Sequence, residues 1–459
     1  MGRPGKQSDE DGAGGGPAEE PQAGGGPGAA RQPAEDQQSA SQPPGATQQA
    51  TGQQNSAQPA PPAGGGAGSG NEPGGSGGGI PRRWLVTAGV AAGAVLIAGV
   101  VFALTQNSGS TSGAGNQASL AAGPIHLSST FPQSGAINVD GAGQIAVNFS
   151  EPLAAHSPHP TIQPSVAGAW SAVGDAFVFT PQTAFAQATK VTVTIPGGPA
   201  GVRSNGGGLL SNTVTEHFTT GMYSQTRLAQ ILAQLGYLPL SWNAGGTAGT
   251  RAQAVMAGGG NKSQAALAYA PPPGTFAWRD SYPVTLTSQW NPDQANTLLQ
   301  GAVMAFKSQH GMTIDGSLTQ KVWDALFTAL GKNQQNKSGY TYAVASKTVP
   351  ETLTIWHNGH VVLHSLANTG IPVSPTVDGT FPVFERFAFQ IMRGTNPGGS
   401  TYADPVSWVS YFNGGDAVHY FPRGSYGFQQ SLGCVELPYN EAKASFPYLT
   451  YGSLVTVTG

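Results

Sequence analysis

The sequence predicts a multidomain chain: a disordered tail, one transmembrane helix, a β-sandwich, a small α-helical bundle and a mainly-β domain at the end. Three observations predict this organisation. Residues 84–104 form a run of 21 positions without a charge, after a tail almost free of large apolar side chains. The hydrophobic period then changes from two residues to about 3.6 and back to two. The only cysteine, Cys434, lies within the last β-rich segment.

The composition argues against one class of partner. The 459 residues contain 20 Lys and Arg against 23 Asp and Glu, which gives a formal net charge of −3 at pH 7. A protein that binds nucleic acid needs a basic surface, so no nucleic-acid partner is expected. Residues 1–83 are rich in Gly, Pro, Gln and Ala and are predicted to be disordered, because they offer little apolar surface to bury.

Residues 84–104 are predicted to be a single transmembrane helix. A helix of this length rises about 30 Å, which matches the hydrocarbon core of a bilayer. A cleaved signal peptide is not favoured, because the run begins far from the N-terminus. Arg82 and Arg83 precede the run, and no Lys or Arg follows it until Lys190. The positive-inside rule therefore predicts a cytoplasmic tail and places everything after residue 105 outside the cell membrane.

Residues 105–123 are predicted to be a flexible linker, and residues 124–221 a small β-sandwich. The stretches "AINVDGAGQIAVNFSEPLA" and "TKVTVTIPGG" alternate apolar and polar residues and are bounded by turn residues. The stretch "FPQSGAINVDGAGQIAVNFSEPL" resembles bacterial Ig-like modules of surface proteins. The resemblance implies a role in spacing and presentation.

Residues 223–335 show helical periodicity. In "SQTRLAQILAQLGYLPL", Leu228, Ile231 and Leu235 fall on one face, and Gly236 is expected to end the helix. A loop rich in Gly and Pro is expected next, within a long insertion at residues 241–296. The stretches "AVMAFKSQHGMTIDG" and "VWDAL" resemble a three-helix peptidoglycan-binding module with a glycan-facing groove. Lys307 stands where that module usually has Gln, and a packed strut without a ligand is the alternative.

Residues 340–459 return to strand patterns. The stretch "ETLTIWHNGHVVLHSLANTG" predicts a hairpin that turns at Asn358–Gly359, and "NEAKASFPYL" predicts one short helix. His357, His360 and His364 lie around this hairpin with no carboxylate or cysteine nearby. Their arrangement does not suit a metal ion, so no metal site is predicted.

Cys434 is the candidate nucleophile of this domain. A thiol attacks an acyl carbon only as thiolate, so it needs a base or a lowered pKa. His419 is the nearest histidine in sequence and is the candidate base. Gly433 permits close approach of the backbone, and amides near Gly433 and Cys434 could stabilise an oxyanion. A backbone carbonyl near Tyr420 could orient the imidazole.

The stretch "HYFPRGSYGFQQSLGCVELP" resembles the catalytic signature of the YkuD-type L,D-transpeptidases, in an architecture of actinobacterial type. Supporting matches are "TVPETLTIWHNG", "NTG", "TVDGTF" and "GSLVTV". The resemblance implies that His419 is the base and Cys434 the nucleophile, with Ser431 and Gly433 as further residues of the catalytic motif. Leu432 stands where the signature has a second histidine, and Glu436 where the family often has Arg or Asn.

The resemblance also implies a reaction and its partners. Cys434 would attack a peptidoglycan stem tetrapeptide, expel the terminal D-Ala and pass the acyl group to the amine of another stem, which gives a 3→3 cross-link. No cofactor is implied, and acylation by carbapenems is expected. The candidate substrate-binding residues are Tyr411, Trp408, Arg393 and Tyr420. The enzyme is expected in the cell wall, where it would contact both stem peptides and glycan.

Two other functions share features with this one. Sortases need an arginine downstream of the cysteine, and no arginine follows Cys434. The remaining alternative is a catalytically impaired, non-enzymatic peptidoglycan-binding wall protein in which Cys434 is merely buried. The sequence leaves open whether the acyl acceptor is a stem peptide, a protein or water, and it does not give the oligomeric state.

Overall fold

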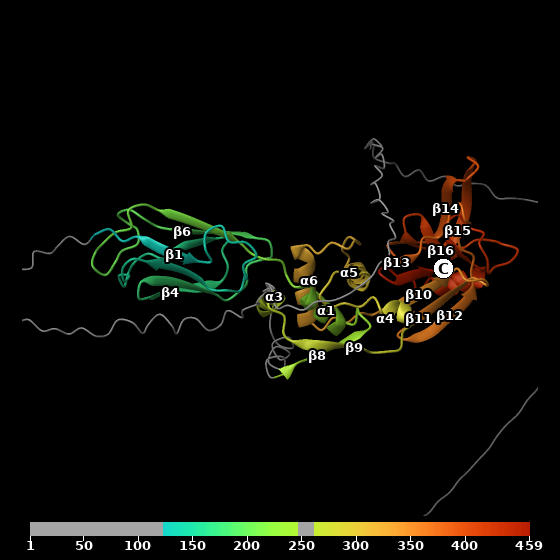
Figure 1. Ribbon diagram of the computed structural model, residues 1–459, viewed down its shortest axis with the longest axis horizontal. Coiled ribbons are helices and arrows are strands. Elements are labelled where there is room, and N and C mark those ends of the chain that lie inside the picture. The colour runs from blue at the N-terminus through green and yellow to red at the C-terminus, as the bar shows by residue number, and fades with distance from the viewer. Residues whose placement is uncertain (1–122, 247–260) are drawn as a thin grey trace, which may run out of the picture. The chain divides into compact units, whose positions relative to one another are not determined.

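The computed structural model describes residues 123–246 and 261–459 (Figure 1). The tail expected at residues 1–83, the helix expected at 84–104 and nearly all of the linker expected at 105–123 lie outside the described residues. Within the described ranges, no helix has the length and apolar character needed to cross a membrane.

The predicted β-sandwich is confirmed, because two antiparallel sheets share one core. In β2, Ile145, Val147 and Phe149 are buried while the residues between them are half-buried. They pack in one cluster with Val191 and Val193 of the other sheet. The first sheet has the order β1-β2-β5-β4, from β1 (Leu127–Phe131), β2 (Ile145–Phe149), β5 (Ala176–Pro181) and β4 (Gly168–Val173). The second has the order β3-β6-β7, from β3 (Thr161–Gln163), β6 (Lys190–Ile195) and β7 (Val214–Thr219).

The helices expected in the middle of the chain are present. They are α1 (Gln225–Gln234), α5 (Thr297–Gln309) and α6 (Gln320–Gly331), whereas α3 (Asn261–Tyr269) and the short α4 (Val284–Thr287) lie where a loop was expected. Ser224 caps α1 by accepting a hydrogen bond from the Arg227 amide, and Gly236 follows the helix with φ +77°. Leu228, Ile231 and Leu235 are buried, as the periodicity predicted.

The prediction of a loop after α1 is wrong in part. Residues Leu240–Ala244 form β8, which pairs antiparallel with β9 (Gly274–Trp278). Leu240 and Trp242 alternate toward the helical core, where both are buried. Strands this short among Gly and Pro residues carry a weak sequence signal, so packing against the helices decides their conformation.

Lys307 of α5 has a structural role in the turn that follows the helix. Its ammonium group contacts the Asp315 side chain, the Asp315 carbonyl at 3.2 Å and Ser317 Oγ at 3.0 Å. The side chain is 3% exposed. Lys307 therefore holds the "HGMTIDG" turn rather than facing a groove.

The C-terminal domain contains two sheets. The first has the order β12-β11-β10-β18-β13, and its β10 and β18 are parallel. The second has the order β14-β15-β16-β17, and its β16 and β17 are parallel. The strands of the first sheet are β10 (Thr341–Ser346), β11 (Thr352–His357), β12 (His360–Leu366), β13 (Gly379–Pro382) and β18 (Leu454–Thr458). The second sheet consists of β14 (Glu385–Thr395), β15 (Thr401–Asn413), β16 (Asp416–Tyr420) and β17 (Val435–Leu437), and α7 (Tyr439–Ser445) follows it.

One core joins the two sheets of this domain. Ile355 and Val455 of the first sheet cluster with Val418 and Val435 of the second, and all four are fully buried. The predicted hairpin turn is confirmed, because Asn358 and Gly359 have φ values of +48° and +78° between β11 and β12. This frame fixes β16 and β17, the strands that carry or adjoin the candidate residues.

Helix α5 packs closely against the turn that precedes β18. A Cβ atom added at Gly452 would lie 2.1 Å from the Gly301 carbonyl oxygen and 2.7 Å from the Ala305 amide nitrogen. Tyr342 of β10 donates a hydrogen bond to Thr285 at 2.9 Å, and Leu454 belongs to the helical core. The helical segment and the C-terminal domain thus share packing at this contact.

The Gly452→Ala change is expected to destabilise the protein. Gly452 has φ +82°, which an alanine adopts only with strain, and its Cβ would also overlap α5. Gly311→Ala is the matched control, because Gly311 has φ +64° but open space around the added Cβ. We expect Gly452→Ala to cost about 1–3 kcal/mol more than the control in urea unfolding. Equal costs for the two variants would show that the α5 contact is loose.

Candidate active site

Cys434 lies immediately before β17 and is 8% exposed. Its Sγ donates to the Gly415 carbonyl at 3.6 Å and lies 4.0 Å from Met392 Sδ of β14. Gly433 precedes it with φ +119°, and a Cβ there would lie 2.4 Å from Asp416 Oδ1. The close backbone approach predicted at Gly433 is therefore present, and only glycine fits it.

His419 shares a sheet face with Cys434. In the parallel pairing of β16 and β17, His419 is opposite Glu436 and Val418 is opposite Val435. Val418 and Val435 belong to the core between the sheets. Because successive side chains alternate, His419 and Cys434 both lie on the other face. The hydrogen bonds of Cys434 Sγ go to the Gly415 carbonyl and to Met392 Sδ, not to the imidazole.

The imidazole has a fixed orientation. His419 Nδ1 donates to the Tyr420 carbonyl at 2.9 Å, and the side chain is 3% exposed. A carbonyl can only accept, so the proton of the neutral ring is on Nδ1 and the lone pair is on Nε2. The backbone carbonyl near Tyr420 orients the histidine, as the sequence suggested.

Burial keeps both groups uncharged in the structure. The pKa of Cys434 is raised to about 12, chiefly by burial and also by the Asp416 and Glu436 carboxylates, while a backbone hydrogen bond at Ala417 lowers it. The pKa of His419 is lowered, chiefly by burial, although the Tyr420 carbonyl and Glu436 act in the opposite direction. At neutral pH the pair is therefore a thiol and a neutral imidazole.

Ser431 acts within the turn that leads to Cys434. It is 1% exposed, and its Oγ donates to the Cys434 carbonyl at 2.6 Å. The same oxygen accepts from the Gly433 amide at 3.3 Å. The hydroxyl of Ser431 and the amide of Gly433 are thus engaged with each other. Ser431 therefore fixes the backbone of the turn.

Tyr411 is the predicted substrate-binding residue that the structure brings toward the thiol. Its hydroxyl accepts a hydrogen bond from Gln390 of β14, and it packs on the cluster that contains Cys434. Burial raises the pKa of Tyr411, and the nearby Cys434 adds to the rise. Burial and the nearby Cys434 also raise the pKa of Tyr402. The sequence alone did not indicate this residue. The signal for Tyr402 was the Gly-rich turn before β15, which folds this strand back along β14.

Three other predicted residues direct their side chains elsewhere. Trp408 has φ +61° where the pairing of β15 with β16 shifts register, and its ring packs on Tyr439 and Phe446. Tyr420 also packs on Tyr439, so only its carbonyl serves the site. Arg393 is exposed and follows Met392 in β14. Since Met392 faces the thiol, the next side chain faces away.

An ion pair holds the loop that connects His419 with Cys434. Arg423 donates to both carboxylate oxygens of Glu436, at 2.8 and 2.7 Å, and to the Gln430 carbonyl at 3.1 Å. The Glu436 side chain is 5% exposed. Leu432, which replaces the histidine of the signature, is half-buried, and its carbonyl accepts from Ser374 Oγ at 3.0 Å.

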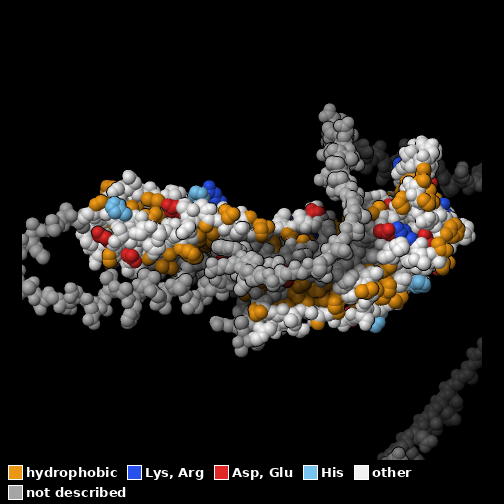
Figure 2. All heavy atoms as spheres, in the orientation of Figure 1, with side chains coloured by type: hydrophobic (Ala, Val, Ile, Leu, Met, Phe, Trp, Pro, Cys, Tyr) orange, Lys and Arg blue, Asp and Glu red, His pale blue; other side chains and the backbone are white. Residues whose placement is uncertain are grey.

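The hairpin of β14 and β15 projects from its sheet (Figure 1). Figure 2 shows hydrophobic side chains along it, and Phe389 and Ile391 are 60% and 42% exposed. Met392, on the other face of the same strand, contacts Cys434. The hairpin thus covers the thiol with one face and exposes the other.

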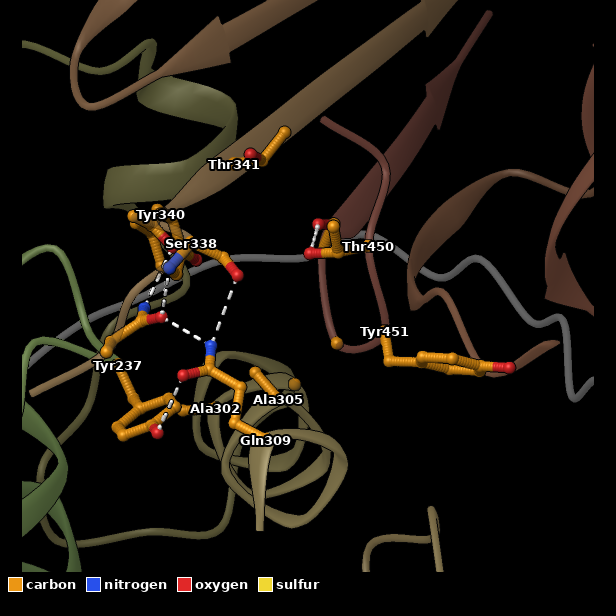
Figure 3. Close-up of a pocket in the computed structure, with 14 residues that line it drawn as sticks. Tyr237, Ala302, Ala305, Gln309, Ser338, Tyr340, Thr341, Thr450 and Tyr451 are labelled. Atoms are coloured by element: carbon orange, nitrogen blue, oxygen red, sulfur yellow. Dashed lines mark hydrogen bonds between the residues drawn. The ribbon is translucent and has the colours of Figure 1, made fainter. Parts of the chain in front are cut away.

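A pocket elsewhere in the structure is separate from this site. Figure 3 shows it between α5 and the turn before β18, with Tyr237 donating to Gln309 at 3.2 Å and Gln309 donating to Asn336 at 2.6 Å. Its water-accessible volume is about 20 Å³, and none of the candidate residues lines it. It has room for one or two water molecules.

The hairpin histidines make other contacts. His357 Nδ1 pairs with Thr341 Oγ1 at 3.0 Å, and His364 Nδ1 pairs with Thr354 Oγ1 at 2.8 Å. Across residues 123–246 and 261–459, no group of three His, Cys, Asp or Glu side chains is arranged to hold a metal ion.

Two family models match the chain. Residues 121–220 match the bacterial Ig-like domain, and residues 340–457 match the L,D-transpeptidase catalytic domain. The comparison with curated proteins gives no match. The two matched segments contain the β-sandwich and the domain of Cys434.

Similar solved structures include three L,D-transpeptidases. One from Mycobacterium smegmatis has 15% identity, with 73% of this chain and 100% of that chain covered and a TM-score of 0.25. L,D-transpeptidase 3 from Mycobacterium tuberculosis has 13% identity, with 72% and 98% covered and a TM-score of 0.24. The catalytic domain of the Enterococcus faecium enzyme has 26% identity, with 26% and 96% covered and a TM-score of 0.24.

Proposed function

The chain contains a YkuD-type L,D-transpeptidase catalytic domain at residues 340–457, and on this premise we propose that it forms 3→3 cross-links between peptidoglycan stem peptides through an acyl-enzyme at Cys434. Members of this family are cysteine-dependent acyltransferases. The observation that carries the proposal is the parallel pairing of β16 with β17, which by strand alternation puts His419 and Cys434, the residue before β17, on one face. The lone pair of His419 Nε2 is left available, because Nδ1 is bound to the Tyr420 carbonyl.

The first half-reaction forms a thioester. Because burial raises the pKa of Cys434 and lowers that of His419, the proton moves to Nε2 as the sulfur attacks, not before. The sulfur attacks the carbonyl of the third stem residue, and the bond to the terminal D-Ala nitrogen breaks. The imidazolium returns its proton to that nitrogen, and D-Ala leaves as a free amine. The donor displaces Met392 from the thiol, which its flexible side chain permits.

The second half-reaction resolves the thioester. The side-chain amine of a second stem attacks the thioester carbonyl, and His419 takes a proton from the amine nitrogen. The carbon–sulfur bond breaks, an amide bond forms, and the sulfur recovers its proton from the imidazolium. No cofactor takes part in this scheme, since the thioester conserves the energy of the cleaved amide.

We also propose an extracellular location. Residues 84–104 would anchor the chain as a single-pass membrane protein with the N-terminus in the cytoplasm and the catalytic domain in the cell wall. Residues 124–221 would act as a spacer. Residues 223–335 would contact glycan through side chains other than Lys307, which is engaged in a turn.

Carbapenem binding belongs to the same proposal. The similar structures include an L,D-transpeptidase in complex with imipenem and the Enterococcus faecium catalytic domain acylated by ertapenem. For this chain, the strained amide of a carbapenem would be opened by Cys434 in the step that a stem peptide otherwise undergoes.

The test is mass analysis of muropeptides. The full chain is incubated with a purified disaccharide-tetrapeptide, and the expected product is a dimer that has lost one D-Ala. Its fragments should place the new bond between the third residues of the two stems. Release of D-Ala without dimer would mean that water is the acceptor, and an unchanged substrate would contradict the transferase function.

A second candidate is a catalytically impaired wall protein. It is favoured by the burial of Cys434 and by Leu432 in the position of the signature's histidine. It predicts that the thiol stays unmodified by a carbapenem under conditions in which the protein is folded.

A further inference from the structure

Glu351 is a buried carboxylate that the proposed chemistry does not use. It lies just before β11 and is fully buried, as is Thr369. Glu351 Oε2 accepts from the Thr369 amide at 2.6 Å, and Oε1 accepts from Thr369 Oγ1 at 2.9 Å. One carboxylate thus fixes both donors of Thr369.

Thr369 in turn holds the segment before the cysteine. Its carbonyl accepts from the amides of Gln430 and Ser431, at 2.9 and 3.0 Å. The Ile371 amide donates to the Ser431 carbonyl at 2.9 Å. The main chain of Ser431 is therefore fixed on both its amide and its carbonyl side.

The hydroxyl of Ser431 connects this segment to the backbone of Cys434. Ser431 Oγ donates to the Cys434 carbonyl at 2.6 Å and accepts from the Gly433 amide. A continuous series of hydrogen bonds thus runs from Glu351 through Thr369 and Ser431 to the backbone of Cys434. Glu351, Thr369 and Ser431 are each at most 1% exposed, so water does not compete for these bonds.

We propose that Glu351 is a positioning residue for Cys434, an inference that rests on the proposed function. By fixing Thr369 and Ser431, it sets the orientation of the Gly433–Cys434 backbone against which an acyl group must bind. Glutamine replaces it incompletely, because its single oxygen accepts from the Thr369 amide while its NH₂ group can only donate, which forces the Thr369 hydroxyl to turn and accept. Both bonds to Thr369 lose their charged acceptor and one of them reverses direction, so Thr369 is held more weakly and the Ser431–Cys434 turn shifts.

The test compares two reactions of one thiol in the full chain. Cys434 is the only cysteine, so both the acylation by imipenem and the alkylation by iodoacetamide report on it without labelling elsewhere. For Glu351→Gln we expect acylation to slow about tenfold or more, because displacement of a reacting group by a fraction of an ångström has effects of this size. Alkylation needs no oriented acyl group and should stay within about twofold of wild type.

Controls separate positioning from general loosening. Glu441→Gln makes the same chemical change on α7, outside the hydrogen-bonded series, and should leave both rates unchanged. Thr369→Ser keeps both donors and should be acylated like wild type, whereas Thr369→Val loses the donor to Oε1 and should be slowed. If Glu351→Gln does not fold, the two Thr369 variants still test whether the bonds between Glu351 and Thr369 position Cys434.

Three outcomes would overturn the inference. A Glu351→Gln protein acylated as fast as wild type removes the positioning role. Equal losses in acylation and alkylation show loosening of the whole site instead. A wild-type protein that imipenem does not acylate refutes the proposed function, and the inference is lost with it.

Discussion

Cys434→Ala is expected to abolish the mass increase that a carbapenem produces on this protein and to abolish dimer formation from stem tetrapeptides. The thiol is the only group on this sheet face that can form the thioester, and no second cysteine can replace it. The loss should therefore reach the detection limit, at least about 10⁴-fold. Whole-protein mass spectrometry after incubation with imipenem measures it.

The same variant should remain folded. Replacing the sulfur with hydrogen removes one buried atom, which costs about 1 kcal/mol. Thermal unfolding close to that of wild type is the control. A mass increase that persists in Cys434→Ala would move the acylation to another nucleophile and contradict the assignment.

His419→Ala is expected to reduce acylation by about 10²–10⁴-fold, the usual contribution of a positioned general base. With the pKa of Cys434 raised to about 12, little thiolate exists at neutral pH unless the imidazole takes the proton. The measurement is the second-order rate of imipenem acylation. The residual rate should rise with pH as solvent hydroxide replaces the base.

Two other substitutions in the same domain serve as matched controls for His419→Ala. His364→Ala removes an exposed histidine of β12 and should leave acylation unchanged. Leu432→Ala alters the position where the signature has its second histidine and should retain much of the activity, because Leu432 donates no proton. Unaltered acylation in His419→Ala, or its loss in Leu432→Ala, would mean that the base is misassigned.

The sequence predicted the parts of the site that local pattern determines. A strand containing His419, a glycine before Cys434 and the turn at Asn358–Gly359 each depend on few neighbouring residues. The common face of His419 and Cys434 followed from strand alternation once β16 and β17 paired. These features of the site were predictable because they depend only on strand periodicity and on one turn.

Other parts depend on contacts between distant segments. The bonds between Glu351 and Thr369 join residues 18 positions apart, and no periodicity indicates them. Trp408 was expected in the cleft, but its positive φ turns the ring toward α7. Strand alternation could not show this, because it assumes an unbroken strand. The role of Ser431 was likewise assigned from the signature, although its hydroxyl is engaged by the Cys434 carbonyl.

The position of β18 has a consequence for biogenesis. This strand follows all the other described strands of its domain in sequence, yet it lies between β10 and β13, and Val455 and Val457 enter the core that also contains Val418 and Val435. While residues 454–458 are still unmade, β10 lacks its parallel neighbour and the interior is open. Residues 454–458 must therefore be synthesised before this domain can assemble, and such long-range pairing is slow to form.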